Sequence, residues 1–133
     1  MKINASVKNS FNKHDVSVST NDNSKTLNIP GKPDNYGSSI NGGELLFAAL
    51  ATCFCNDIYR ESAKRNMKIN SVEVNVEGEF GSEGDPASNI IYHTKIDAPE
   101  YSQKEIDDLI AYVDKIAEVH NTLRKGAAVS ISN

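Results

Sequence analysis

The sequence predicts an α+β fold with the element order βββ-α-ββ-α-β, carried by a single domain over residues 1–133. Three observations support this prediction. Alternating apolar and polar residues, typical of half-buried strands, occur in two separate blocks of the chain. A long apolar segment rich in the helix formers Ala and Leu lies between these blocks. A second helical pattern follows the later block, and neither a linker nor an internal repeat divides the chain.

Three short strands are predicted in the first block. Residues 2–9 and 14–20 alternate between apolar and polar side chains, and residues 25–29 form a third short strand. Polar turns rich in Asn separate the three segments, so we expect an antiparallel meander. Residues 30–43 are rich in Pro, Gly, Asn and Ser and predict a loop. A loop of this length is either mobile or functional.

The second block contains the clearest strand of the sequence. In residues 69–80, valines alternate with Glu and Asn, and residues 89–96 return as the antiparallel partner. Ser102, followed three residues later by Glu105, forms a capping box that starts the second helix. Residues 127–131 are predicted to be a short closing strand.

The central helix is predicted to open near Gly42 or Gly43 and to run to about Asn66. Residues 44–55 are apolar almost all round for three turns. A helix that is apolar on every side has to be covered on every side, whereas one small sheet covers one face. We therefore expect a homodimer.

Composition argues against nucleic acid and membrane as partners. The net charge is −4, and Lys and Arg are scattered without a basic stripe, whereas phosphate neutralisation supplies most of the affinity for nucleic acid. The densest apolar stretch, residues 45–50, is too short to cross a bilayer. Residues 1–6 lack the apolar core of a secretory signal, so we expect a cytoplasmic protein.

The sequence indicates neither a metal site nor a cofactor. Gly42 and Gly43 mark a helix entrance, because no phosphate-loop pattern surrounds them. The histidines are far apart in the sequence and are expected to be solvated or hydrogen-bonded rather than zinc ligands; they are His14, His93 and His120.

The two cysteines, Cys53 and Cys55, lie in the central helix. Residues two apart on a helix point about 200° away from each other, so this pair is predicted neither to form a disulfide nor to chelate a metal. Cys53 shares a stripe with Leu46 and Leu50 and has two interpretations. It is either a small core residue or a reactive thiol, and a reactive thiolate there requires a cationic or hydrogen-bonding partner from elsewhere in the fold.

Residues 42–53, GGELLFAALATC, resemble the central helix of the OsmC/Ohr family, the osmotically inducible and organic hydroperoxide resistance proteins. The strand at residues 69–76 and the segment VHNTLRKG at residues 119–126 fit the same family. The resemblance implies an intertwined homodimer in which antiparallel sheets wrap two long central helices. It also implies active sites at the subunit interface.

The resemblance further implies reduction of organic hydroperoxides, with Cys53 as the peroxidatic cysteine and Glu44 near the family's glutamate. The resolving cysteine is absent, because Ala117 takes its place, and no Arg precedes Arg60 to match the family's N-terminal Arg. The resemblance therefore implies a thiol redox protein, a hydroperoxide reductase that reacts through Cys53 with organic hydroperoxides or related electrophiles and uses an external thiol as reductant. The alternative is a non-catalytic OsmC-like protein that binds a small apolar ligand at the dimer interface.

Overall fold

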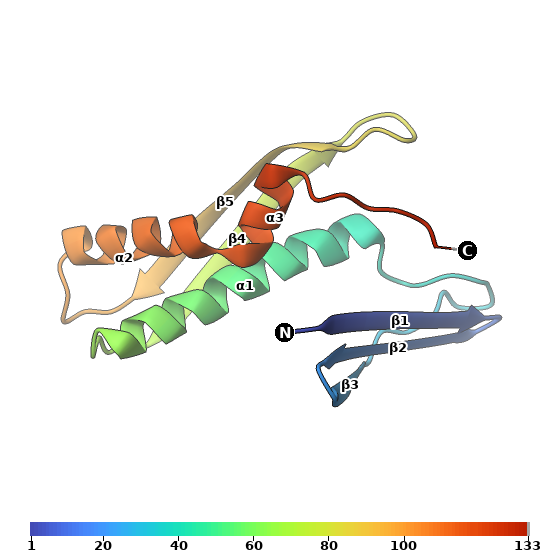
Figure 1. The fold of residues 1–133 in the computed structure, drawn as a ribbon, viewed down its shortest axis with the longest axis horizontal. Helices are drawn as coiled ribbons and strands as arrows, with labels where there is room; N and C mark the ends of the chain where they lie inside the picture. The colour runs from blue at the N-terminus through green and yellow to red at the C-terminus, as the bar shows by residue number, and fades with distance from the viewer. Residues whose placement is uncertain (133) are drawn as a thin grey trace. The chain divides into compact units, whose positions relative to one another are not determined.

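The computed structural model describes residues 1–132 and divides the chain into two compact units, Met1–Leu45 and Leu46–Asn133, of which Asn133 lies outside the described residues. Figure 1 shows the elements of both units. Among the described residues, no helix has the length and apolar character needed to span a membrane.

The first unit is the predicted antiparallel meander. Its strands are β1 (Ile3–Ser10), β2 (Lys13–Thr20) and β3 (Asn23–Leu27), in the order β1-β2-β3. The turns between them place Asn12 and Asn21 at φ values of 60° and 51°, a left-handed conformation that Asn tolerates better than most residues.

The predicted loop that follows β3 folds back onto the β1–β2 turn. The Asn12 amide donates a hydrogen bond of 3.0 Å to the carbonyl of Asn35. The side chain of Asn9 binds both backbone groups of Gly37, accepting from its N–H at 2.8 Å and donating to its carbonyl at 3.1 Å. These bonds fix the path of the loop within the first unit.

The second unit combines three helices with a two-stranded hairpin. Helix α1 (Gly42–Lys64) is followed by the antiparallel strands β4 (Ser71–Phe80) and β5 (Ala87–Asp97), and then by α2 (Gln103–Ile116) and α3 (Glu118–Lys125). The valines of β4 are half-buried while the residues between them are exposed, as the alternation predicts. The predicted capping box of α2 is confirmed, with Ser102 and Glu105 bonded reciprocally.

The predicted closing strand is wrong, and so is the single second helix. Residues 127–131 form no strand, and Val129 and Ile131 are 95% and 88% exposed, because no neighbouring strand pairs with them among the described residues. The helical chain breaks at Ala117, whose φ and ψ of −64° and 105° are extended, and resumes as α3. Helix α3 then ends at Gly126 in the left-handed conformation typical of helix C-termini.

The core of the second unit lies where α1, α2 and the β4–β5 hairpin meet. Phe54 and Ile58 of α1 pack with Leu109 and Val113 of α2 and with Ala117 at the helix break, and all five are almost completely buried. This packing covers α1 on one face only. Leu45, in the first turn of α1, is 40% exposed.

Candidate functional site

Cys53 lies in the middle of α1, next to the break between α2 and α3. Its side chain is partly exposed, and its Sγ donates a hydrogen bond of 3.8 Å to Oδ2 of Asp57, one helical turn further on. The backbone N–H of Val119, just after the break, acts on the same sulfur and lowers the pKa of the thiol. The thiol therefore has a carboxylate on one side and a backbone donor on the other.

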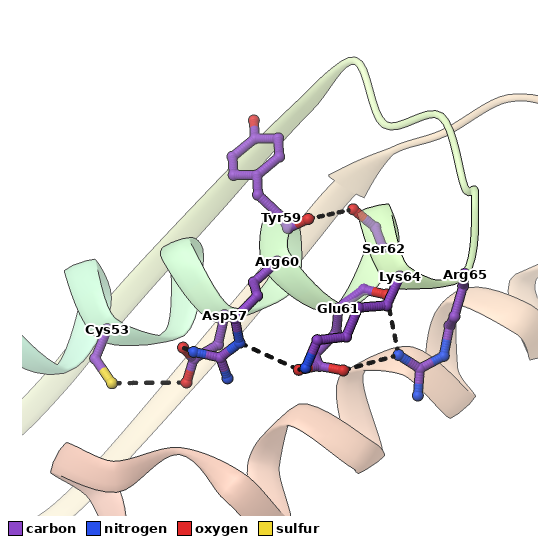
Figure 2. Close-up of polar contacts among 8 residues, drawn as sticks. All are labelled: Cys53, Asp57, Tyr59, Arg60, Glu61, Ser62, Lys64 and Arg65. Carbon is purple, nitrogen blue, oxygen red and sulfur yellow. Dashed lines mark hydrogen bonds and ion pairs between the residues drawn. The ribbon is translucent and has the colours of Figure 1, made fainter.

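The carboxylate of Asp57 begins a row of charged side chains along α1, which Figure 2 shows. Asp57 is only 3% exposed, and its Oδ1 lies 2.8 Å from Nη1 of Arg60. Arg60 also contacts Oε1 of the buried Glu61 at 3.2 Å, and Glu61 accepts further ion pairs from Lys64 and Arg65. The positive charge of Arg60 is thus shared between two buried carboxylates and does not act on Cys53 alone.

These surroundings favour the protonated thiol. Burial raises the pKa of Cys53, and the negative charges of Asp57 and Glu118 raise it further, while the hydrogen bond from Val119 acts in the opposite direction. A negative charge on sulfur is disfavoured both by lost hydration and by the neighbouring carboxylates. At neutral pH the isolated chain therefore holds Cys53 mainly as the thiol.

Cys55 and Cys53 belong to different sides of α1. Both are free, and Cys55 lies in a shallow depression that also includes Thr52, Asn56 and Val74 of β4. The two sulfurs are not joined in this structure. Ala117, which occupies the resolving position implied by the resemblance, is fully buried in the core and supplies no sulfur.

Glu44 lies in the first turn of α1, within the first unit. Its Oε1 accepts a hydrogen bond of 3.0 Å from the backbone N–H of Asn41, and its own N–H donates to Oδ1 of Asn41 at 2.8 Å. This reciprocal arrangement is a capping box, so the carboxylate stabilises the start of the helix. Within its own unit, the contacts of Glu44 serve the helix end.

Two functional features escaped the sequence reasoning. The spacing of Cys53 and Asp57 places them on one helix face and could have been read as an interacting pair. His120, expected to be solvated or hydrogen-bonded, is instead buried, and neither of its ring nitrogens has a hydrogen-bond partner. No local pattern signals that burial, because it arises from the packing of α3.

Within residues 1–132, no group of three potential ligand side chains could hold a metal ion.

Comparison with known proteins gives the family of the chain. Residues 35–132 match the family model described as OsmC-like protein, so the chain belongs to the OsmC-like family. No curated protein matches its sequence.

Three solved structures share the fold. An OsmC-like protein from Mycoplasma pneumoniae is 22% identical with a TM-score of 0.64, covering 92% of this chain and 89% of its own. A protein from Legionella pneumophila, described as an organic hydroperoxide resistance protein OsmC, predicted redox protein and regulator of sulfide bond formation, is 18% identical with a TM-score of 0.61, covering 93% and 90%. An organic hydroperoxide resistance protein from Elizabethkingia anophelis is 20% identical with a TM-score of 0.63, covering 95% and 90%.

Proposed function

We propose that this OsmC-like chain is a thiol redox protein that reduces organic hydroperoxides or related electrophiles through Cys53. The observation that carries the proposal is the position of Cys53, partly exposed in the middle of α1, where the backbone N–H of Val119 lowers the pKa of its thiol. A fixed donor of this kind stabilises negative charge on sulfur without a proton transfer. The organic hydroperoxide resistance described for two proteins of the same fold supports the choice of substrate class.

The proposed reaction transfers one oxygen atom to Cys53. The thiolate attacks the terminal oxygen of the hydroperoxide, an S–O bond forms, and the O–O bond breaks. Sulfur loses two electrons and becomes a sulfenic acid, and the peroxide is reduced to an alcohol that takes up the proton released by the thiol. Two equivalents of an external thiol then return Cys53 to the reduced form, with release of water and formation of a disulfide of the external thiol.

The external thiol is needed because Ala117 supplies no second sulfur. A sulfenic acid that no thiol captures is open to further, irreversible oxidation. Glu44 is kept in this proposal as the acidic residue of the family motif that assists Cys53, in addition to its contact with Asn41.

We also propose that the chain acts as a cytoplasmic homodimer. The two reduced cysteines suit a reducing compartment. Apolar side chains of α1 and of the meander are left uncovered in a single chain, including Leu45, Ile3 and Val7, which are 40%, 65% and 61% exposed. Such surfaces favour association with a second copy.

A second candidate function is that of a non-catalytic OsmC-like protein that binds a small apolar ligand at the dimer interface, and one observation favours it. Burial and the neighbouring carboxylates raise the pKa of Cys53, which opposes the thiolate that peroxide reduction requires. Binding of an apolar ligand that persists in a Cys53→Ala variant would support this function.

The test treats the reduced protein with one equivalent of an organic hydroperoxide and a sulfenic-acid trap, followed by intact mass measurement. Cys53→Ser and Cys55→Ser are the matched variants, because both cysteines are free in one helix. We expect one trapped adduct that disappears in Cys53→Ser and persists in Cys55→Ser. An intact fold with no adduct on Cys53 would refute the proposed reaction.

A further inference from the structure

The second unit contains a pocket between α3, β5 and α1. Leu123 and Arg124 of α3, Ile90 and Tyr92 of β5, and Leu50 of α1 contribute to its wall, and its volume is about 280 Å³. Figure 1 shows α3 beside β5 in this unit. The volume is near the lower end of the range for small-molecule sites, which indicates a small ligand.

His120 also lines this pocket, and its ring nitrogens have no partner. The side chain is 5% exposed, and among the described residues neither Nδ1 nor Nε2 makes a hydrogen bond. The ring is held by Tyr92 and Phe54, with centroids 4.7 Å and 5.5 Å away. A buried polar group without a partner costs folding free energy, so its presence at a pocket wall indicates a site that a ligand completes.

At neutral pH the imidazole of His120 carries no charge, because its pKa is lowered from the ordinary value. Burial lowers the pKa of His120, and the positive charge of Arg124 lowers it further, while the carboxylates of Asp114 and Asp57 act in the opposite direction. A neutral imidazole has one N–H donor and one acceptor nitrogen. The ring therefore offers a hydrogen bond to an acceptor that enters the pocket.

The charge of the wall favours an anion. Arg124 lines the pocket, while its pair Asp114 does not belong to the wall, and no carboxylate is found among the described lining residues. Arg124 donates three hydrogen bonds, to the Asp114 carbonyl, the Asp114 carboxylate and Asn121. A guanidinium has five N–H donors, so Arg124 can also donate a hydrogen bond to an oxygen of a ligand.

We propose that this pocket binds a small monocarboxylic acid with an apolar body. The carboxylate accepts hydrogen bonds from His120 and Arg124, and the apolar body contacts the side chains of Leu50, Ile90 and Leu123. A water molecule that enters with the ligand can donate to the remaining nitrogen of His120. Cys53 is not part of the wall, so the proposal does not depend on the thiol chemistry proposed above.

The test is a titration of the full chain with octanoate, followed by isothermal calorimetry and by the melting temperature. Octanol and octylamine are the matched ligands, because they keep the chain length and change the head group to neutral or cationic. We expect saturable binding of octanoate that raises the melting temperature. Octanol should bind at least about tenfold more weakly, since a hydrogen bond to a charged group is worth more than a neutral one.

His120→Phe is the matched protein variant, because it keeps an aromatic ring and removes both nitrogens. We expect octanoate to bind about tenfold more weakly to it, and Cys53→Ser to bind like the original protein. If His120→Phe does not fold, Arg124→Gln tests the same loss of a donor. The proposal is overturned if octanoate shows no saturable binding, if octylamine binds equally well, or if the folded variant binds octanoate with unchanged affinity.

Discussion

Burial raises the pKa of Cys53, and the negative charge of Asp57 raises it further, so removing that charge should make the thiol more reactive rather than less. In Asp57→Asn, the carboxylate that accepts the thiol hydrogen bond at 3.8 Å loses its charge. The guanidinium of Arg60, 2.8 Å from Asp57, simultaneously loses one of its two anionic partners. Both changes stabilise the thiolate, so Cys53 should react faster in the variant.

The size of the effect follows from the distance between sulfur and carboxylate. Two unit charges 3.8 Å apart interact by about 1 kcal/mol in water and by about 4 kcal/mol at an effective dielectric constant of about 20. Loss of the smaller interaction energy, about 1 kcal/mol, raises the thiolate population about fivefold. A more acidic thiol is also a weaker nucleophile, and this lowers the gain in rate by about half. Because Cys53 is partly exposed and Arg60 already offsets part of the charge, we expect a rate increase of about three- to tenfold near neutral pH.

The assay is the rate of alkylation of Cys53 by iodoacetamide as a function of pH, in a Cys55→Ser background. Glu118→Gln, the weaker of the two carboxylates that raise the pKa of Cys53, should give a smaller increase. Asp108→Asn, which removes an exposed carboxylate paired with Lys104, should give none. A folded Asp57→Asn variant that reacts no faster than the parent protein would refute this account, and Glu118→Gln carries the test if Asp57→Asn does not fold.

Three further predictions concern the helix cap at Glu44, the resolving position at Ala117 and the tight packing at Gly78 of β4. Glu44→Gln keeps a side chain that can complete the capping box, so stability should fall by less than about 1 kcal/mol, while Cys53 oxidation slows if Glu44 assists the thiol; an unchanged oxidation rate would limit Glu44 to the cap. Ala117→Cys should form a disulfide with Cys53 after one equivalent of hydroperoxide, which leaves Cys55 as the one alkylatable thiol of three; two free thiols in the oxidised variant would contradict the proximity of residue 117 to Cys53. Gly78→Ala should lower the free energy of unfolding by about 1–3 kcal/mol in chemical denaturation, because an added Cβ would lie 2.7 Å from the ring of Phe47; an unchanged midpoint would show that Phe47 moves freely.

The sequence predicted the strands and the central helix because their signals are local. The valine alternation of β4, the Asn-containing turns of the meander and the Ser102 capping box each depend on residues close together in the chain. The closing strand failed because apolar residues at 127–131 alternate like a strand, while a strand also needs a neighbour to pair with. The periodicity of one segment gives no information on whether a second strand lies beside it.

The candidate site was predictable only in part. The helix carrying Cys53 was readable from the sequence, and the resemblance to the family implied that Ala117 replaces the resolving cysteine. The break at Ala117 was not, because residues 115–118 continue the helical composition, although Ala117 is extended and lies in the core. Val119 and His120 follow this break directly. The N–H of Val119 acts on the sulfur of Cys53, and the ring of His120 packs against Tyr92.

The protected thiol and the missing resolving cysteine are physically connected. A chain without a resolving cysteine has no internal route away from the sulfenic acid, so each unproductive oxidation risks permanent loss of Cys53. Burial and the charges of Asp57 and Glu118 keep the thiol protonated and therefore slow to react. The nearest cation along the helix, Arg60, is paired with Asp57 and Glu61, so its positive charge is not available to stabilise the thiolate of Cys53. Activation of Cys53 therefore requires positive charge from outside the surroundings described for this helix, and a second subunit, as expected for a homodimer, is the source that the proposal predicts.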